Sequence, residues 1–229
     1  YLIDPSSYLT REFGSFPRFM GPFINPNVAG ISILLIVIYI NNQNFSRLNK
    51  RLILLVLFAG LYLTQSKTAW ILFPICFMNK RLIKWYLVLL AAVTLFLFIK
   101  FDLQRVLPSL FARFSLWSAY SFEDLSFFGQ GFDTFGAGIG TVGSSSIVII
   151  DSFYVSAAFS GGLTYLTLIV VFFFVLPFWK AHKYDRLVSP AVAIMSIACM
   201  TGNFLENGFP ANILFLAIIM NRRKAMRKP

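Results

Sequence analysis

The sequence predicts an all-α protein, a polytopic bundle of about seven transmembrane helices with one long extracytoplasmic loop. Hydrophobic residues make up 58% and charged residues 13% of the chain, and the mean hydropathy is +0.73, which is typical of polytopic membrane proteins. Apolar runs alternate with short basic turns, and only residues 101–150 form a long segment too polar for a bilayer. We therefore treat residues 1–229 as a single transmembrane domain and residues 101–151 as its extracytoplasmic loop.

Charge and cysteine content narrow the range of partners. A net charge of +11 would suit nucleic acid, but the basic residues lie in turns between apolar runs, where charges set membrane orientation. Cys76 and Cys199 lie far apart in apolar runs, so the sequence indicates neither a disulfide framework nor a metal site. We expect no nucleic-acid partner, no metal and no cofactor. Because the chain starts at Tyr1, we expect it to be the C-terminal part of a longer protein.

Taken in order, residues 1–26 are polar and turn-rich, and Asn27 is expected to cap the first span. A glycine pair, Gly161-Gly162, inside one of the later runs is expected to be a close-packing point. The expected runs are residues 27–40, 52–63, 69–78, a run that ends near residue 99, and residues 153–179, 188–200 and 209–220.

The run between residues 52 and 78 has two interpretations. Each half is only about 12 residues long, whereas a straight span needs about 20, so one long helix is an alternative. That helix would bury Lys67 near the membrane centre, at a cost of about 2.5 to 3.5 kcal/mol. We therefore favour two short helices joined by a polar turn, residues 64–68, at the outer surface.

The distribution of basic residues predicts the orientation. Most of them are expected on one side, which should be cytoplasmic. That side holds Arg47, Lys50, Arg51, Lys80, Arg81, Lys84, Lys180, Lys183, Arg186, Arg222, Arg223, Lys224, Arg227 and Lys228. The outer side would hold every acid except Asp185. With the single long helix and its ends reversed, the charges fit almost as well, but the long loop still faces outward.

Basic residues on the outer side run against the usual bias, so each needs a reason. Lys100 and Arg105 are expected to snorkel from the end of a span. If Arg18, Lys67 and Arg113 converge, they would form a cationic pocket suited to phosphate, because Arg offers paired donors and Lys a point charge. The alternative is that these cations pair with outward-facing acids or with lipid headgroups.

Four stretches of the chain, in order, form a recognisable pattern. They are Arg18-Phe-Met-Gly21 through Asn25-Pro26-Asn27 to Gly30; Leu63-Thr64-Gln65-Ser66-Lys67 with Ala69; Arg113 to Ala119 including Trp117, followed by Gly129-Gln-Gly131-Phe132; and Asp151-Ser-Phe-Tyr154. Together they resemble the superfamily of O-antigen ligases and Wzy-type O-antigen polymerases, and the resemblance covers about residues 18–176. Asp151 stands where ligases tend to have His, which favours a polymerase, and Lys67 stands where Arg is usual, which loosens the expected contact to phosphate.

This resemblance implies a bundle similar to the GT-C glycosyltransferases in the bacterial cytoplasmic (inner) membrane, with its active face extracytoplasmic. It implies transfer or polymerisation of saccharide units from an undecaprenyl-diphosphate-linked donor to a glycan or lipid-linked acceptor, in O-antigen, capsule or exopolysaccharide synthesis. The expected partners are that donor, that acceptor, the lipid bilayer and other polysaccharide-assembly membrane proteins. Arg18, Lys67 and Arg113 are assigned to the diphosphate, and Arg113 also to catalysis, since fixed cations stabilise the charge that develops on the leaving group.

A base near the acceptor hydroxyl is the other requirement, and Asp151 is the candidate because it lies where the loop meets the next span. Asp151 could instead cap that span, and Glu123 and Glu206 are lesser candidates. Asn25, Asn27, Trp117, Gly129 and Gly131 are expected to position substrate or loop, with glycine allowing the backbone to approach a sugar. His182, the only histidine, lies among cations on the cytoplasmic side.

Two other functions remain open. A transporter or flippase of lipid-linked oligosaccharide would place charged groups and broken helices near the membrane centre, and the expected spans contain few charges. A structural membrane subunit without activity is the second alternative, although outward cations in a membrane protein usually have a function.

Overall fold

The computed structural model describes residues 10–13, 16–19, 26–43, 45–100, 125–129 and 152–200, with side chains from residue 27 onward except at 97, 98 and 100. Apart from one short hairpin, the regular elements in this part of the chain are helices, which agrees with the predicted helical class. In order, the elements are β1 (Thr10–Phe13), β2 (Phe16–Phe19), α2 (Pro26–Asn41), α3 (Arg47–Thr64), α4 (Lys67–Leu72), η1 (Phe73–Phe77), α5 (Lys80–Lys100), α8 (Phe153–Ile169), η3 (Val170–Val175), α9 (Leu176–Lys180) and α10 (Val188–Ala198).

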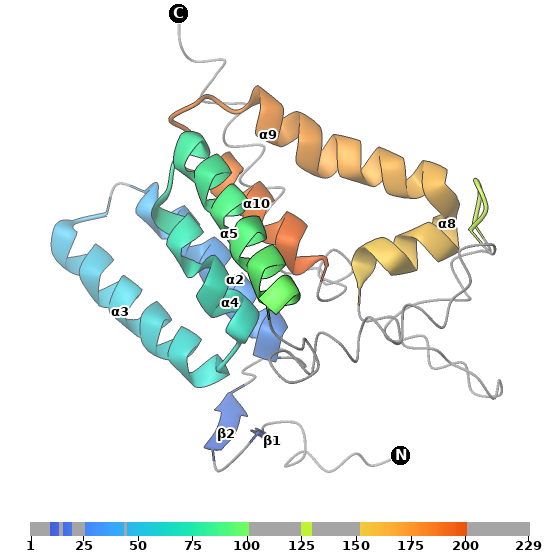
Figure 1. The fold of residues 1–229 in the computed structure, drawn as a ribbon. Coiled ribbons are helices and arrows are strands. Elements are labelled where there is room, and N and C mark those ends of the chain that lie inside the picture. The colour runs from blue at the N-terminus through green and yellow to red at the C-terminus, as the bar shows by residue number, and fades with distance from the viewer. Residues whose placement is uncertain are drawn as a thin grey trace, which may run out of the picture.

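Helix α2 lies at the centre of the bundle (Figure 1). It contacts α3, α4, η1 and α10, and its side chains Ile31, Leu34, Leu35 and Ile38 are at most 1% exposed. A helix that is apolar on all sides is a buried helix, so the sequence of α2 explains its position. Pro26 is its first residue, where the fixed backbone angle of proline suits a helix start.

A tight reversal separates α3 from α4, which excludes a single helix through residues 52–78. Gln65 follows α3 in the left-handed conformation, with φ 48° and ψ 29°, and ends the helix. The hydroxyl of Ser66 then caps α4 by accepting from the N–H of Ala69 at 3.3 Å. Beyond the turn, the rings of Phe58 and Phe73 meet at 5.8 Å between centroids. The two helices are therefore antiparallel, as we predicted.

Helix α10 is the second central element. It contacts α2, η1, α5, η3 and α9, and Ile194 and Met195 are fully buried. Its start packs near the basic turn of residues 180–187, and its far end receives the start of α8, because the N–H of Phe153 donates to the carbonyl of Cys199 at 3.0 Å. Helices α2 and α10 thus form the shared core of the described helices.

A break at Gly162 divides the helix that runs from Phe153 to Lys180. Gly162 has φ 76° and ψ 177°, values that interrupt the helix, and Figure 1 shows α8 bending at this region before η3 and α9. Leu163 and Thr164 begin the second half, and their N–H groups donate to the carbonyls of Ser126 and Phe127 at 3.2 and 3.3 Å. The predicted span from residue 153 to residue 179 is helical on both sides of Gly162. At its glycine pair the helix is interrupted, and residues 126 and 127 bind there through their carbonyl groups.

Three basic turns meet at one end of the bundle. The amide of Asn42 donates to the carbonyl of Arg186 at 2.8 Å, which joins the first turn to the turn before α10. The ammonium of Lys80 donates to the carbonyls of Trp179 and Ala181, both at 2.8 Å, which joins the start of α5 to the same region. The predicted common location of these turns is confirmed.

The outward faces of α3 and α5 are apolar. On α3, Leu55 and Val56 are each 67% exposed, and on α5 the exposed fractions of Trp85 and Ile99 are 67% and 70%. Within the described ranges, one helix, Phe153–Lys180, is long and apolar enough to cross a membrane, and α2, Lys67–Phe77 and α10 are shorter apolar helices. The count of seven spans stays a prediction.

Candidate functional site

The candidate site begins where α2 meets α4, at the end of the bundle opposite the three basic turns. Here the hydroxyl of Ser66 donates to the side-chain oxygen of Asn27 at 2.8 Å, across 39 residues of sequence. Asn27 belongs to the first of the four motif stretches and Ser66 to the second. The structure therefore brings these two stretches into direct contact. Asn27 lies inside the first turn of α2, which starts at Pro26, so the expectation that Asn27 caps this helix was wrong.

A glycine allows this close approach of the two helices. A Cβ added at Gly30 would lie 2.8 Å from the Cβ of Ala69 and 3.0 Å from the Cβ of Ser66. Carbon atoms in ordinary contact are about 3.5 to 4.0 Å apart, so any larger residue at this position would push α4 away. Gly30 and Ala69 are thus packing residues, a role that their motifs alone did not reveal.

Lys67 is the first residue of α4 and its side chain is exposed. Ser66 caps α4 and fixes its first turn, and the side chain of the next residue, Lys67, then points away from the bundle. The hairpin lies at the same end of the bundle, where β2 contacts α3 near the start of α2 (Figure 1). Arg18 lies in β2, paired with Arg11 in the antiparallel register. Two of the three predicted diphosphate-binding residues therefore belong to elements at one end of the bundle.

Gly129 also lies in the described part of the chain, and it packs against the break in α8. It has φ 74°, and a Cβ there would lie 2.2 Å from the carbonyl oxygen of Ser160 and 2.5 Å from the nitrogen of Gly162. The reverse holds as well, because a Cβ at Gly162 would lie 2.4 Å from the carbonyl oxygen of Phe127. We expected glycine here to let the backbone approach a sugar, and at Gly129 it approaches the backbone of α8.

The remaining candidates lie outside the described residues. The candidate base is among them, but the start of the helix that follows it is described. The N-cap position of α8 is Ser152, so the alternative in which Asp151 occupies that cap position was wrong. The candidates outside the described residues are Asn25, Arg113, Trp117, Gly131, Asp151, Glu123 and Glu206.

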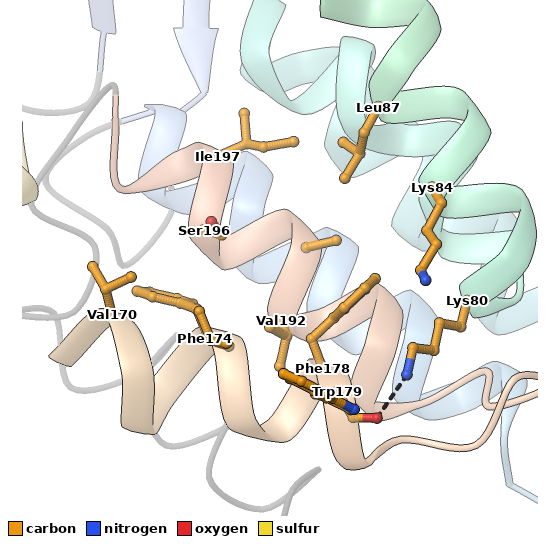
Figure 2. Close-up of a pocket in the computed structure, with 12 residues that line it drawn as sticks. Lys80, Lys84, Leu87, Val170, Phe174, Phe178, Trp179, Val192, Ser196 and Ile197 are labelled. Atoms are coloured by element: carbon orange, nitrogen blue, oxygen red, sulfur yellow. Dashed lines mark hydrogen bonds between the residues drawn. The ribbon is translucent and has the colours of Figure 1, made fainter. Parts of the chain in front are cut away.

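A hollow between α5, η3, α9 and α10 was not predicted (Figure 2). Its volume is about 630 Å³, and Lys80 and Lys84 line it together with apolar side chains. The sequence does contain a signal for it, because Lys80 and Lys84 lie four residues apart at the start of α5 and so share one face of the helix. Within the described ranges, no group of three or more His, Cys, Asp or Glu side chains could hold a metal ion.

Searches against protein-family models, curated proteins and solved structures found no match for this chain. The resemblance of the four stretches to O-antigen ligases and polymerases is therefore still a prediction.

Proposed function

We propose that the chain is part of a multi-pass membrane glycosyltransferase. In this proposal it transfers or polymerises saccharide units from an undecaprenyl-diphosphate-linked donor on the outer face of the bacterial cytoplasmic membrane. The acceptor is a growing glycan or a lipid-linked sugar, and polymerisation is favoured over ligation by Asp151, which stands where ligases tend to have His.

The outward apolar faces of α3 and α5 support the membrane location. Large apolar side chains such as Leu55, Trp85 and Ile99 are more than half exposed, and many exposed apolar side chains on one helix favour contact with a membrane or a partner. The three basic turns share one end, as the orientation rule requires of cytoplasmic turns. The opposite end, with Lys67, then faces outward.

The observation that carries the proposal is the contact between Asn27 and Ser66. It joins two of the four motif stretches at the end assigned to the outer face, and it places the exposed ammonium of Lys67 beside their junction. Diphosphate is a good leaving group, so transfer needs little acid catalysis. Fixed cations near the diphosphate stabilise its developing charge, and Lys67 with Arg18 and Arg113 has this role in the proposal.

A second candidate function, a flippase for the same lipid-linked sugar, is favoured by the broken helix at Gly162. Transporters often use interrupted helices at their substrate sites. Against it, Lys67 is exposed on a helix end rather than enclosed among spans. Reconstituted vesicles distinguish the two functions, because a flippase moves labelled lipid-linked sugar across the bilayer without lengthening the glycan.

The test is glycan elongation by the purified full-length protein with an undecaprenyl-diphosphate-linked repeat unit as donor, read by mass spectrometry. We expect Lys67→Ala to lower the elongation rate by at least tenfold, and Lys67→Arg to retain most of it because the charge remains. Arg51→Ala, an exposed cation on α3 near the basic end, is the matched control and should elongate normally. Normal elongation by both Lys67→Ala and Arg113→Ala would overturn the proposal.

A further inference from the structure

The hollow between α5, η3, α9 and α10 is apolar along its length and basic at one end. Figure 2 shows Leu87 and Ile197 toward one end of it and Phe178 nearer the other, with Trp179 and the two lysines at that second end. Its volume of about 630 Å³ is in the usual range for ligand pockets, about 300 to 1,000 Å³. Because its lining is mostly apolar, the hollow suits a hydrocarbon chain better than a polar ligand.

The two lysines differ in how they are held. The Lys80 ammonium donates to the carbonyls of Trp179 and Ala181, both at 2.8 Å, and lies 5.4 Å from the centre of the Phe178 ring. Lys84, one turn further along α5, has no hydrogen-bond or ion-pair partner among the described residues. Asp185 is the acid whose charge acts on Lys80. Its carboxylate already accepts a hydrogen bond from the N–H of Ser189 at 2.6 Å.

Among the described residues, the charge at this end of the hollow is therefore not fully neutralised. Partial burial, and then the adjacent ammonium of Lys84, lower the pKa of Lys80, and Asp185 only opposes this shift. An anionic group placed between the two ammonium groups would remove their mutual repulsion. It would also give Lys84 a partner, which this side chain lacks among the described residues.

We propose that this hollow binds an anionic phospholipid of the surrounding membrane. The phosphate lies at Lys84 and Lys80, and one acyl chain runs along Phe174, Val192 and Ile197. Trp179, 76% exposed beside the lysines, sits at the level of the headgroups, where Trp is common in membrane proteins. Basic pockets between transmembrane helices on the cytoplasmic side are the expected place for such lipids.

The position of the lysines selects a phospholipid rather than the polyprenyl diphosphate donor. Lys80 and Lys84 share the end of the bundle that carries the basic turns, whereas the proposed transfer site lies at the other end, with Asn27 and Ser66. The inference rests on the membrane location proposed above and not on glycosyl transfer. Failure of lipid binding would therefore leave the elongation assay unaffected, and failure of elongation would leave lipid binding unaffected.

The test uses delipidated full-length protein in detergent and native mass spectrometry. The probes are phosphatidylglycerol, phosphatidylcholine with the same acyl chains, undecaprenyl diphosphate and inorganic phosphate. We expect phosphatidylglycerol to bind more tightly than phosphatidylcholine. Lys84→Ala should raise the Kd for phosphatidylglycerol about fivefold, which is the affinity that one cation near an anionic headgroup contributes. Arg81→Ala, an exposed cation on α5 outside the hollow, is the matched control and should keep the wild-type Kd.

A phosphatidylglycerol with a photoreactive acyl chain locates the tail. Cross-links should fall on peptides of η3, α9 and α10, and the yield should drop in Lys84→Ala and not in Arg81→Ala. Equal binding of the two phospholipids, an unchanged Kd in Lys84→Ala, or cross-links spread over α3 would overturn the proposal. Tighter binding of undecaprenyl diphosphate, or inorganic phosphate that competes off the phospholipid, would also overturn it, because the occupant would then be the carrier or a free anion.

Discussion

Replacement of Gly30 by alanine should destabilise the bundle, because the added methyl group would push α2 away from α4. These two helices carry the first and the second motif stretch. The added Cβ would lie 2.8 Å from the Cβ of Ala69, whereas carbon contacts settle at about 3.5 to 4.0 Å. Helices α2 and α4 would therefore have to move apart by about 0.7 to 1.2 Å. That movement would stretch the hydrogen bond from Ser66 to Asn27, now 2.8 Å, beyond the usual range for hydroxyl donors.

Gly60→Ala in α3 is the matched control, because its added Cβ would only reach the flexible end of Ile33 at 3.4 Å. Both substitutions gain the same helix propensity, about 0.5 to 1 kcal/mol, so this gain cancels when the two variants are compared. The difference between them is then the overpacking cost, about 1 to 3 kcal/mol. In a chain of this size each kcal/mol corresponds to about 2 to 4 °C in Tm.

The assay is thermal unfolding of the full-length protein in detergent, followed with a thiol-reactive dye that reports exposure of the buried Cys76 and Cys199. We expect Gly30→Ala to unfold several degrees below Gly60→Ala. Adding Ala69→Gly to Gly30→Ala removes the clashing carbon, so the double variant should lose less stability than the sum of the two single changes. Equal Tm values for Gly30→Ala and Gly60→Ala would refute the helix contact.

Two further variants test the neighbouring contacts by the same assay. Ser66→Ala removes both the cap of α4 and the hydrogen bond to Asn27, whereas Ser46→Ala removes only the cap of α3. Ser66→Ala should therefore lower the free energy of unfolding by about 1 kcal/mol more than Ser46→Ala. Equal losses of stability in the two variants would contradict the hydrogen bond. Gly162→Ala places a side chain at a residue with a positive φ and against the backbone of Phe127. It should lower the free energy of unfolding by about 1 to 2 kcal/mol. A Tm equal to that of the wild type would contradict the break in the helix at Gly162.

The helices of the described residues follow largely from the sequence. The apolar run of α2 predicts a buried helix, and the cost of burying Lys67 predicts the reversal between α3 and α4. The common location of the basic turns follows from the orientation rule. These inferences succeed because local hydrophobicity and charge decide them.

The contacts between distant segments did not follow from the sequence. The bond from Ser66 to Asn27 spans 39 residues, and no local pattern specifies which hydroxyl meets which amide. Likewise, Gly162 is predicted as a packing glycine, but only the positive φ and the docked carbonyls of Ser126 and Phe127 show that it breaks the helix. The pocket beside Lys84 requires α5, η3, α9 and α10 to be placed together before its volume exists.

The central claim is that cations far apart in sequence converge at the end of the bundle opposite the basic turns. The most direct measurement is cross-linking of paired cysteines in the full-length protein with a short bis-maleimide, since Cys76 and Cys199 are buried and should not react. We predict that Lys67→Cys with Arg113→Cys cross-links efficiently, whereas Lys67→Cys with Lys183→Cys does not. If the first pair fails to cross-link while each single cysteine reacts freely with maleimide, the claim is contradicted.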